Sequence, residues 1–144
     1  MGTEINNHVG TVPLARENTE NPSDAVGNGG AITVNTRLLE ISDQARITAN
    51  SYSQGNSGDI TLNTDNIVVN GGAIAGLILE GTGNTGNVTV NNTDSIILNE
   101  GSNIQAQVLN GGSGNVGDVT INTRNLAINK RFSFILADNA SAGN

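Results

Sequence analysis

The chain lacks cysteine and tryptophan and has only 2 prolines among its 144 residues. Without cysteine it can form neither disulfides nor thiolate metal sites. Both prolines, Pro13 and Pro22, precede Gly27, so every later residue keeps the backbone N–H that strand pairing needs. Aromatic residues make up 2% of the chain and charged residues 13%. These fractions are low for an ordinary globular domain and typical of an elongated repeat protein.

Basic residues are also scarce, with 6 Lys and Arg against 13 Asp and Glu and a formal net charge of -7. The chain therefore repels phosphate, which excludes nucleic acid as a partner. No apolar run approaches the ~18 residues of a membrane-spanning helix. The opening MGTEINNHVG lacks the basic and apolar parts of a signal peptide, so we expect any export signal to lie outside this chain.

Glycine and asparagine are abundant, and they recur in one motif. The stretch GNSGDITLNT at Gly55 is nearly repeated as GNGGAITVNT at Gly27, GNTGNVTVNN at Gly83 and GNVGDVTINT at Gly114. These starts, 28, 28 and 31 residues apart, divide residues 27–144 into repeat units, and Gly143-Asn144 predicts the start of a fifth. Residues 1–26 are predicted to be an irregular lead-in or a degenerate coil. We expect a longer array, in which neighbouring coils of the same chain are the partners of this segment.

Each unit contains three short apolar alternations separated by turn-forming residues. In the second unit they are Ile60 to Leu62, Ile67 to Val69 and Ile74 to Leu77. A period of two indicates strands, and no helical spacing persists. Three short strands cannot bury a core alone, but stacked units can pair each strand with its counterpart ~4.8 Å away. The sequence therefore predicts an all-β parallel β-helix, or solenoid, with three short strands per coil and about four coils.

Aligned units predict which side chains face inward. The first two strands give four aliphatic columns: Ile32, Ile60, Val88 and Val119; Val34, Leu62, Val90 and Ile121; Leu39, Ile67, Ile96 and Leu126; Ile41, Val69, Leu98 and Ile128. The third strand gives a looser inward column of Ile47, Ile74, Ile104 and Phe134, and an outward column of Thr48, Ala75, Gln105 and Ile135. The glycines that open each unit, and those three residues later, are predicted to supply the positive φ of a turn.

The repeat G-N-x-G-[DN]-[IV]-T-[IVL]-N-T, followed by apolar strands and a glycine-rich turn, resembles the repeats of filamentous haemagglutinin-type exoproteins. These are large bacterial adhesins exported by two-partner secretion, and some are labelled S-layer family proteins. The resemblance, over Gly27 to Asn144, implies a right-handed β-helix rod, secreted or at the cell surface in association with the outer membrane. It also implies an outer-membrane transporter as a partner. The secretion domain that this transporter recognises is not visible in the chain, which is not expected to be exported alone by that route.

Carboxylates in the repeats raise the alternative of a carbohydrate-active β-helix enzyme. Asn63-Thr64-Asp65, echoed one unit later, matches part of a polygalacturonase signature, but there is no Asp-Asp pair or Gly-His-Gly. Arg37 and Arg124 occupy the equivalent positions in other units, which indicates exposed pairs of Arg37 with Asp65 and of Asp94 with Arg124. We predict no catalytic residue. Calcium would need an acid in every turn, and the column of Ala31, Asp59, Asn87 and Asp118 is not regular, so no metal or cofactor is predicted.

Two outward columns of the first strand are the same in every unit. They consist of Thr33, Thr61, Thr89 and Thr120, and of Asn35, Asn63, Asn91 and Asn122. A threonine stack with an asparagine ladder would stabilise the array. The alternative is an ice-binding lattice, which favours threonine in both columns. On the second strand, Val68 and Ile97 are adjacent outward aliphatics and form a possible contact patch.

The main functional hypothesis is a non-enzymatic rod segment of a secreted surface adhesin that extends or presents binding regions. Its external partner would be a host or matrix surface, either glycan or protein. An enzyme whose catalytic residues lie in other coils, and an ice-binding solenoid, remain the alternatives.

Overall fold

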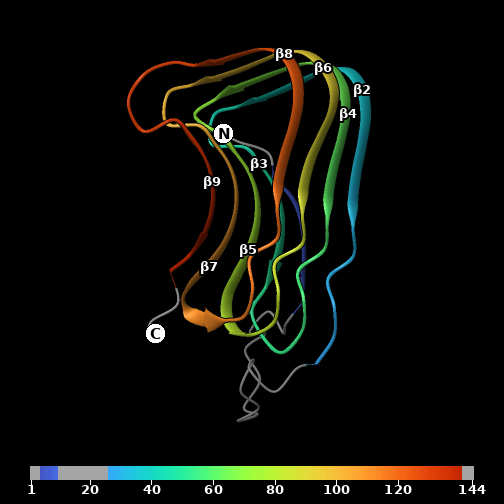
Figure 1. Cartoon of the computed structure of the whole chain (residues 1–144), viewed down its shortest axis with the longest axis vertical. Helices are drawn as coiled ribbons and strands as arrows, with labels where there is room; N and C mark the ends of the chain where they lie inside the picture. Colours follow the sequence, from blue (N-terminus) through green and yellow to red (C-terminus); the bar gives the residue numbers. More distant parts are fainter. Residues whose placement is uncertain (1–3, 10–25, 141–144) are drawn as a thin grey trace.

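The computed structural model describes residues 4–9 and 26–140, and within these ranges it contains strands and no helix. The parallel strands stack into a β-solenoid, as predicted. In Figure 1 the chain ascends one side, crosses the top and descends the other side, while successive coils approach the viewer. This winding is right-handed. No helix of the described residues is long and apolar enough to cross a membrane.

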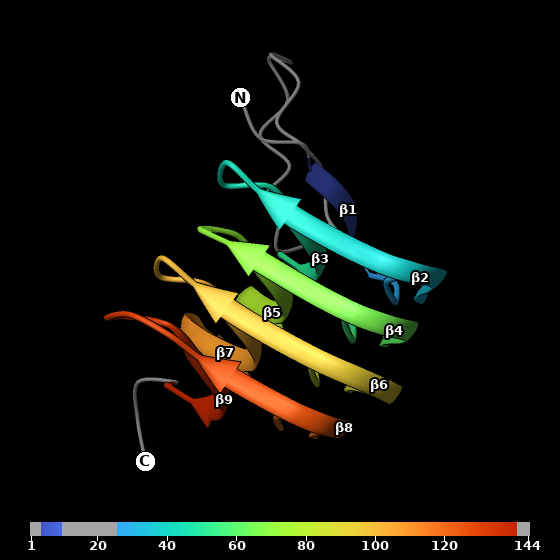
Figure 2. The same cartoon turned by 90° about the horizontal axis from the view of Figure 1, so that it is seen from above.

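Two sheets form the walls of the solenoid, and Figure 2 shows the strands of each sheet in sequence order along the axis. The four-stranded sheet contains β2 (Ile32–Ser42), β4 (Ile60–Asn70), β6 (Val88–Asn99) and β8 (Val119–Ile128). The five-stranded sheet contains β1 (Glu4–Val9), β3 (Arg46–Ser51), β5 (Ala73–Thr82), β7 (Asn103–Ser113) and β9 (Phe134–Asn139). We number the coils 1 to 4 by these pairs: β2 with β3, β4 with β5, β6 with β7, and β8 with β9.

The first two predicted strands of each unit run on as one continuous strand of the four-stranded sheet. They are joined at a bend where a threonine hydroxyl donates to the carbonyl two residues later, as from Thr64 Oγ1 to the Asn66 oxygen at 2.8 Å. Thr64 and its counterpart Thr93 are buried, but Thr93 Oγ1 donates instead to the carbonyl oxygen two residues earlier, that of Asn91, at 3.4 Å. The bend is therefore an internal feature of a long strand, where the sequence predicted a turn.

The core follows the predicted inward columns of the four-stranded sheet. Strand pairing places Ile60 opposite Ile32 and Val88, and Ile67 opposite Leu39 and Ile96. Ile60 and Ile67 are 0% exposed. Most of the other core side chains of coils 2 and 3 are also fully buried, among them Leu62, Val69, Val90 and Leu98. The strand pairing of the predicted columns is confirmed, but in the last coil Leu126 and Ile128 are 47% and 44% exposed and do not belong to the core.

The predicted facing of β9 is wrong. Ile135, not Phe134, pairs with Ile104 and packs against the core, whereas Phe134 pairs with Asn103 and is 39% exposed. Leu136, the next residue, pairs with Gln105. The segment between Asn129 and Ile135 is one residue longer than that between Asn99 and Ile104. A shift of one residue in a strand exchanges its two faces.

The outer side of the five-stranded sheet also differs from the prediction. Thr48 and Ala75 were expected to face outward, but they are 4% and 1% exposed. This side of the sheet is concave in Figure 1. Its inner side carries the small residues Ala49, Gly76 and Ala106 in one column. A Cβ on Gly76 would lie 3.6 Å from the oxygen of Gly86 in the opening turn, an ordinary van der Waals distance, so alanine would also fit at this position.

The positive φ predicted for the repeated glycines is found at only some of them, and a second need explains the rest. Of those that open the units, Gly55 and Gly114 have positive φ, at 140° and 142°. Gly58 and Gly86 do not, but a Cβ on Gly86 would lie 2.2 Å from the Gly58 carbonyl oxygen of the coil before. Close approach of stacked backbones therefore requires glycine in both columns, and an unusual φ requires it only in some coils.

Part of the segment 1–26 joins the solenoid, since β1 pairs in parallel with β3 from Glu4↔Arg46 to Val9↔Ser51. Val26 forms an isolated parallel bridge with Gln54. The predicted fifth unit at Gly143-Asn144 lies outside the described residues.

Candidate functional surface

The threonine column is arranged as predicted along the four-stranded sheet. Thr61 pairs with Thr33 and Thr89, and Thr89 pairs with Thr120. The end members Thr33 and Thr120 are exposed, and the two inner members are half-buried. The strands thus present a row of hydroxyls, one per coil, on an open face.

Beside this column the predicted asparagine ladder is hydrogen-bonded through three coils. Asn63 Nδ2 donates to Asn35 Oδ1 at 2.7 Å, and Asn91 Nδ2 donates to Asn63 Oδ1 at 3.0 Å. Asn122 is exposed and follows Ile121, at which the pairing of β6 with β8 shifts register. The inner amides therefore use their hydrogen-bonding groups on one another, which supports the structural reading of the ladder.

The sequence analysis did not predict two further asparagine ladders. At the end of the long strands, Asn99 Nδ2 donates to Asn70 Oδ1 at 2.8 Å and Asn129 Nδ2 donates to Asn99 Oδ1 at 3.1 Å. The second ladder lies in the opening turn and runs from Asn28 through Asn56 and Asn84 to Asn115. In it, the side-chain oxygen of one asparagine accepts the backbone N–H of the asparagine one coil later, at 2.8 to 3.0 Å. Identical residues in successive units were the available signal in both cases.

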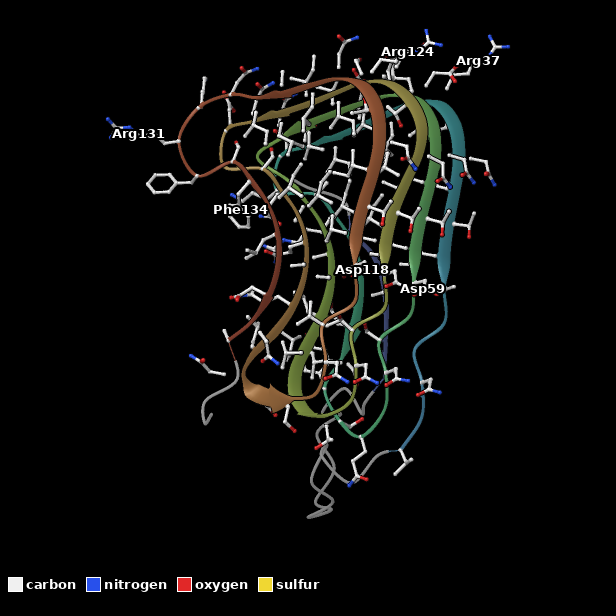
Figure 3. All side chains as sticks on the ribbon, in the orientation of Figure 1. Arg37, Asp59, Asp118, Arg124, Arg131 and Phe134 are labelled. Atoms are coloured by element: carbon white, nitrogen blue, oxygen red, sulfur yellow. The ribbon has the colours of Figure 1, made fainter. Side chains whose placement is uncertain are left out.

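A related column in the same turn mixes acid and amide. The backbone N–H of Asn87 donates to Asp59 Oδ1 at 2.7 Å, and that of Asp118 donates to Asn87 Oδ1 at 2.9 Å. Figure 3 shows Asp59 and Asp118 on the flank where the long strands begin. These carboxylates serve the backbone of the turn, and the described residues contain no cluster of three His, Asp or Glu that could hold a metal.

Charged side chains meet at the bend, where Figure 3 places Arg37 and Arg124. Arg124 lies 3.5 Å from Asp94 as predicted, and both side chains are well exposed. Arg37 and Asp65, both described residues, form no ion pair, so that predicted contact is wrong. Lys130 and Glu100 form a pair at 3.0 Å in the loops that follow the long strands. Exposed pairs of this kind contribute at most ~1 kcal/mol each.

One surface depression lies at the bend of the last two coils, and another lies at the opening turns of the first three. One is lined by Thr93, Asn122, Thr123 and Arg124, and the other by turn residues that include Asn28, Asn56, Asn84 and Asp59. Their polar groups are amides, hydroxyls and backbone. No described nucleophile there lies against a general base, so the arrangement suits hydrogen bonding and offers no constellation for covalent chemistry.

The candidate contact residues Val68 and Ile97 are paired neighbours of β4 and β6, and each is half-buried. Glu40 and Ala127 continue the same column in coils 1 and 4. The aliphatic patch on the inner coils is thus small. The large exposed apolar side chains lie mainly in the first and last coils, and include Leu38, Leu126, Ile128 and Phe132.

Comparisons with protein-family models, with curated proteins and with solved structures find no match to this chain. Its functional interpretation therefore rests on its residues and their arrangement.

Proposed function

We propose that this chain is a non-enzymatic rod segment of a secreted bacterial surface protein of the haemagglutinin-like adhesin class. The observation that carries the proposal is the continuity of the surface. Columns of threonine and asparagine cross coil after coil in register, and the side-chain amides of the asparagine column bond to the next coil from Asn35 to Asn91. Such a surface extends and stiffens a solenoid.

The chemistry of the exposed columns supports the same proposal. Catalysis needs several groups of different kinds to converge on one point, whereas this face repeats the same groups at one-coil intervals. Uncharged amides and hydroxyls keep a long rod hydrated without a strong field of either sign. The resemblance of the repeat to haemagglutinin-type exoproteins supplies the cell-surface setting.

The proposal can be tested by asking whether this chain is exposed on the surface of the cells that produce it. Antibodies against the folded chain should label intact bacteria or their secreted fraction, and brief protease treatment of intact cells should remove the labelling. A cytoplasmic marker, detected only after permeabilisation, is the control. Antigen found only after permeabilisation would contradict the proposal.

A second assay separates the rod from the enzyme alternative. The protein should release no reducing sugar from plant or bacterial polysaccharides. Release of sugar that Asp65→Asn or Asp94→Asn abolishes, in variants that keep the wild-type circular dichroism, would replace the proposed function with a carbohydrate-active one.

A further inference from the structure

Three asparagines of the chain are followed by glycine: Asn28, Asn70 and Asn110. In such a pair the glycine nitrogen can attack the side-chain amide carbon, because glycine has no Cβ to hinder ring closure. The nitrogen gives up its proton, the side-chain nitrogen leaves as ammonia, and the new C–N bond closes a succinimide ring. Water then opens the ring to aspartate or isoaspartate. The asparagine side chain must turn toward the next nitrogen, so hydrogen bonds that hold either group slow the reaction.

Two of these pairs are held by the asparagine ladders. Asn28 Oδ1 accepts the backbone N–H of Asn56 at 2.9 Å, and the Gly29 N–H donates to the Asn56 carbonyl at 2.9 Å. Asn70 Oδ1 accepts from Asn99 Nδ2 at 2.8 Å, and the N–H of the next glycine donates to the Asn99 carbonyl at 3.1 Å. In both pairs, the attacking nitrogen and the attacked amide are therefore bonded to the following coil.

The third pair lies in an irregular part of the five-stranded sheet. Between Val108 and Gly111 the pairing of β7 with β5 shifts register, and only Leu79 lies opposite the two intervening residues. Such a bulge leaves a residue without a regular ladder partner. Asn110 is exposed, and its side chain forms no hydrogen bond with the described part of the chain. Its amide is therefore free to turn toward Gly111.

We propose that Asn110 and Gly111 form a modification site, at which the folded chain converts Asn110 to aspartate or isoaspartate through a succinimide, while the ladders protect Asn28 and Asn70. The reaction needs no reagent other than water. It adds a negative charge beside Glu80, which pairs with Gly111 and is exposed. Like charges on neighbouring strands are destabilising, so the modification weakens the pairing at the ends of β5 and β7. The proposal is independent of the adhesin function.

The test follows the three sites in one sample of the full 144-residue chain. The folded chain is incubated in mildly alkaline buffer, in which a larger fraction of the glycine nitrogen is deprotonated. A glutamate-specific protease then cuts after Glu40 and Glu80, which places Asn28, Asn70 and Asn110 in separate fragments, and mass spectrometry measures the conversion of each. We expect Asn110 to react about tenfold faster than either other site, because the others must first break one or two hydrogen bonds.

Two controls show that the fold makes the difference. In concentrated urea the three sites should react at similar rates, because each has the same reacting pair. Asn99→Ala removes the side-chain bond to Asn70 and should speed the reaction at Asn70 about two- to fivefold, with the rate at Asn110 unchanged. The proposal is overturned if the folded chain reacts equally at all three sites, if Asn28 or Asn70 reacts before Asn110, if the tenfold difference persists in urea, or if Asn99→Ala leaves Asn70 as slow as before.

Discussion

The two sheets of the solenoid differ in where they accommodate irregular length. In the four-stranded sheet, β6 contains one extra residue at the bend, and the pairing resumes beyond it at Asn66↔Ser95. The five-stranded sheet also has an extra residue within a strand, in β7 opposite the step from Ile78 to Glu80, but in addition its strands follow loops of unequal length, at residues 43–45, 71–72, 100–102 and 129–133. In both sheets the aliphatic column continues across the irregularity. Burial of the core therefore fixes the register, and bulges and loops absorb the extra residues.

The largest effect should come from breaking the four-stranded sheet at its centre. Ile67→Asp places a carboxylate in a site that is 0% exposed, so we expect the free energy of unfolding to fall by more than ~4 kcal/mol. Circular dichroism at rising urea concentration measures this. Glu40→Ala, at an exposed position of the adjacent column, is the control and should shift stability by less than ~0.5 kcal/mol. Equal losses in both variants would contradict the facing of this sheet.

A smaller loss is expected where the turns of successive coils touch. Gly86→Ala would place a Cβ 2.2 Å from the Gly58 oxygen, and the stacked backbones must separate to relieve the contact. We expect a loss of about 1–3 kcal/mol, measured by the same urea titration. Stability equal to that of the wild type would mean that the glycine columns reflect something other than close approach.

The corrected register of the five-stranded sheet can be tested at its last strand. Ile135→Asp should destabilise the protein by about 1–3 kcal/mol, because Ile135 is half-buried against the core. Phe134→Asp, at the neighbouring exposed position, should cost less than ~1 kcal/mol. Thermal unfolding of the two variants ranks them directly. The opposite ranking would restore the facing that the sequence first suggested.

The smallest effect is expected on the outer surface. Asn63→Ala removes a residue bonded to both Asn35 and Asn91, and should cost about 0.5–1.5 kcal/mol. Asn122→Ala is the matched control in the same column, within the register shift between β6 and β8, and should cost less. If the two variants lose the same stability, the ladder contributes nothing beyond the side chains themselves.

Most of the four-stranded sheet could be predicted from the sequence, because period-two alternation and four aligned units determine facing without knowledge of loops. Columns such as Val34, Leu62, Val90 and Ile121 keep the same offset from the repeated glycines. The facing of β9 could not be predicted in this way. Phe134 and Ile135 are both apolar, and the preceding loop decides which of them reaches the core.

Only those polar columns whose residues are identical in every unit could be predicted from the sequence. Residues identical in all units, such as the Thr61 and Asn63 columns, are visible in an alignment, and their stacking follows from the fold. The turn column that joins Asp59, Asn87 and Asp118 mixes two residue types, so the shared role of their oxygens as acceptors of backbone N–H groups appears only in three dimensions.

The spacing of the coils also has a mechanical consequence. Folded, each coil adds only ~4.8 Å to the length of the rod, the distance between paired strands. Pulled out from the end, the same 28 residues between Asn35 and Asn63 extend to roughly 90–100 Å. A pulling force that unfolds one coil would therefore lengthen the chain greatly. The coils that remain folded would keep their ladders intact.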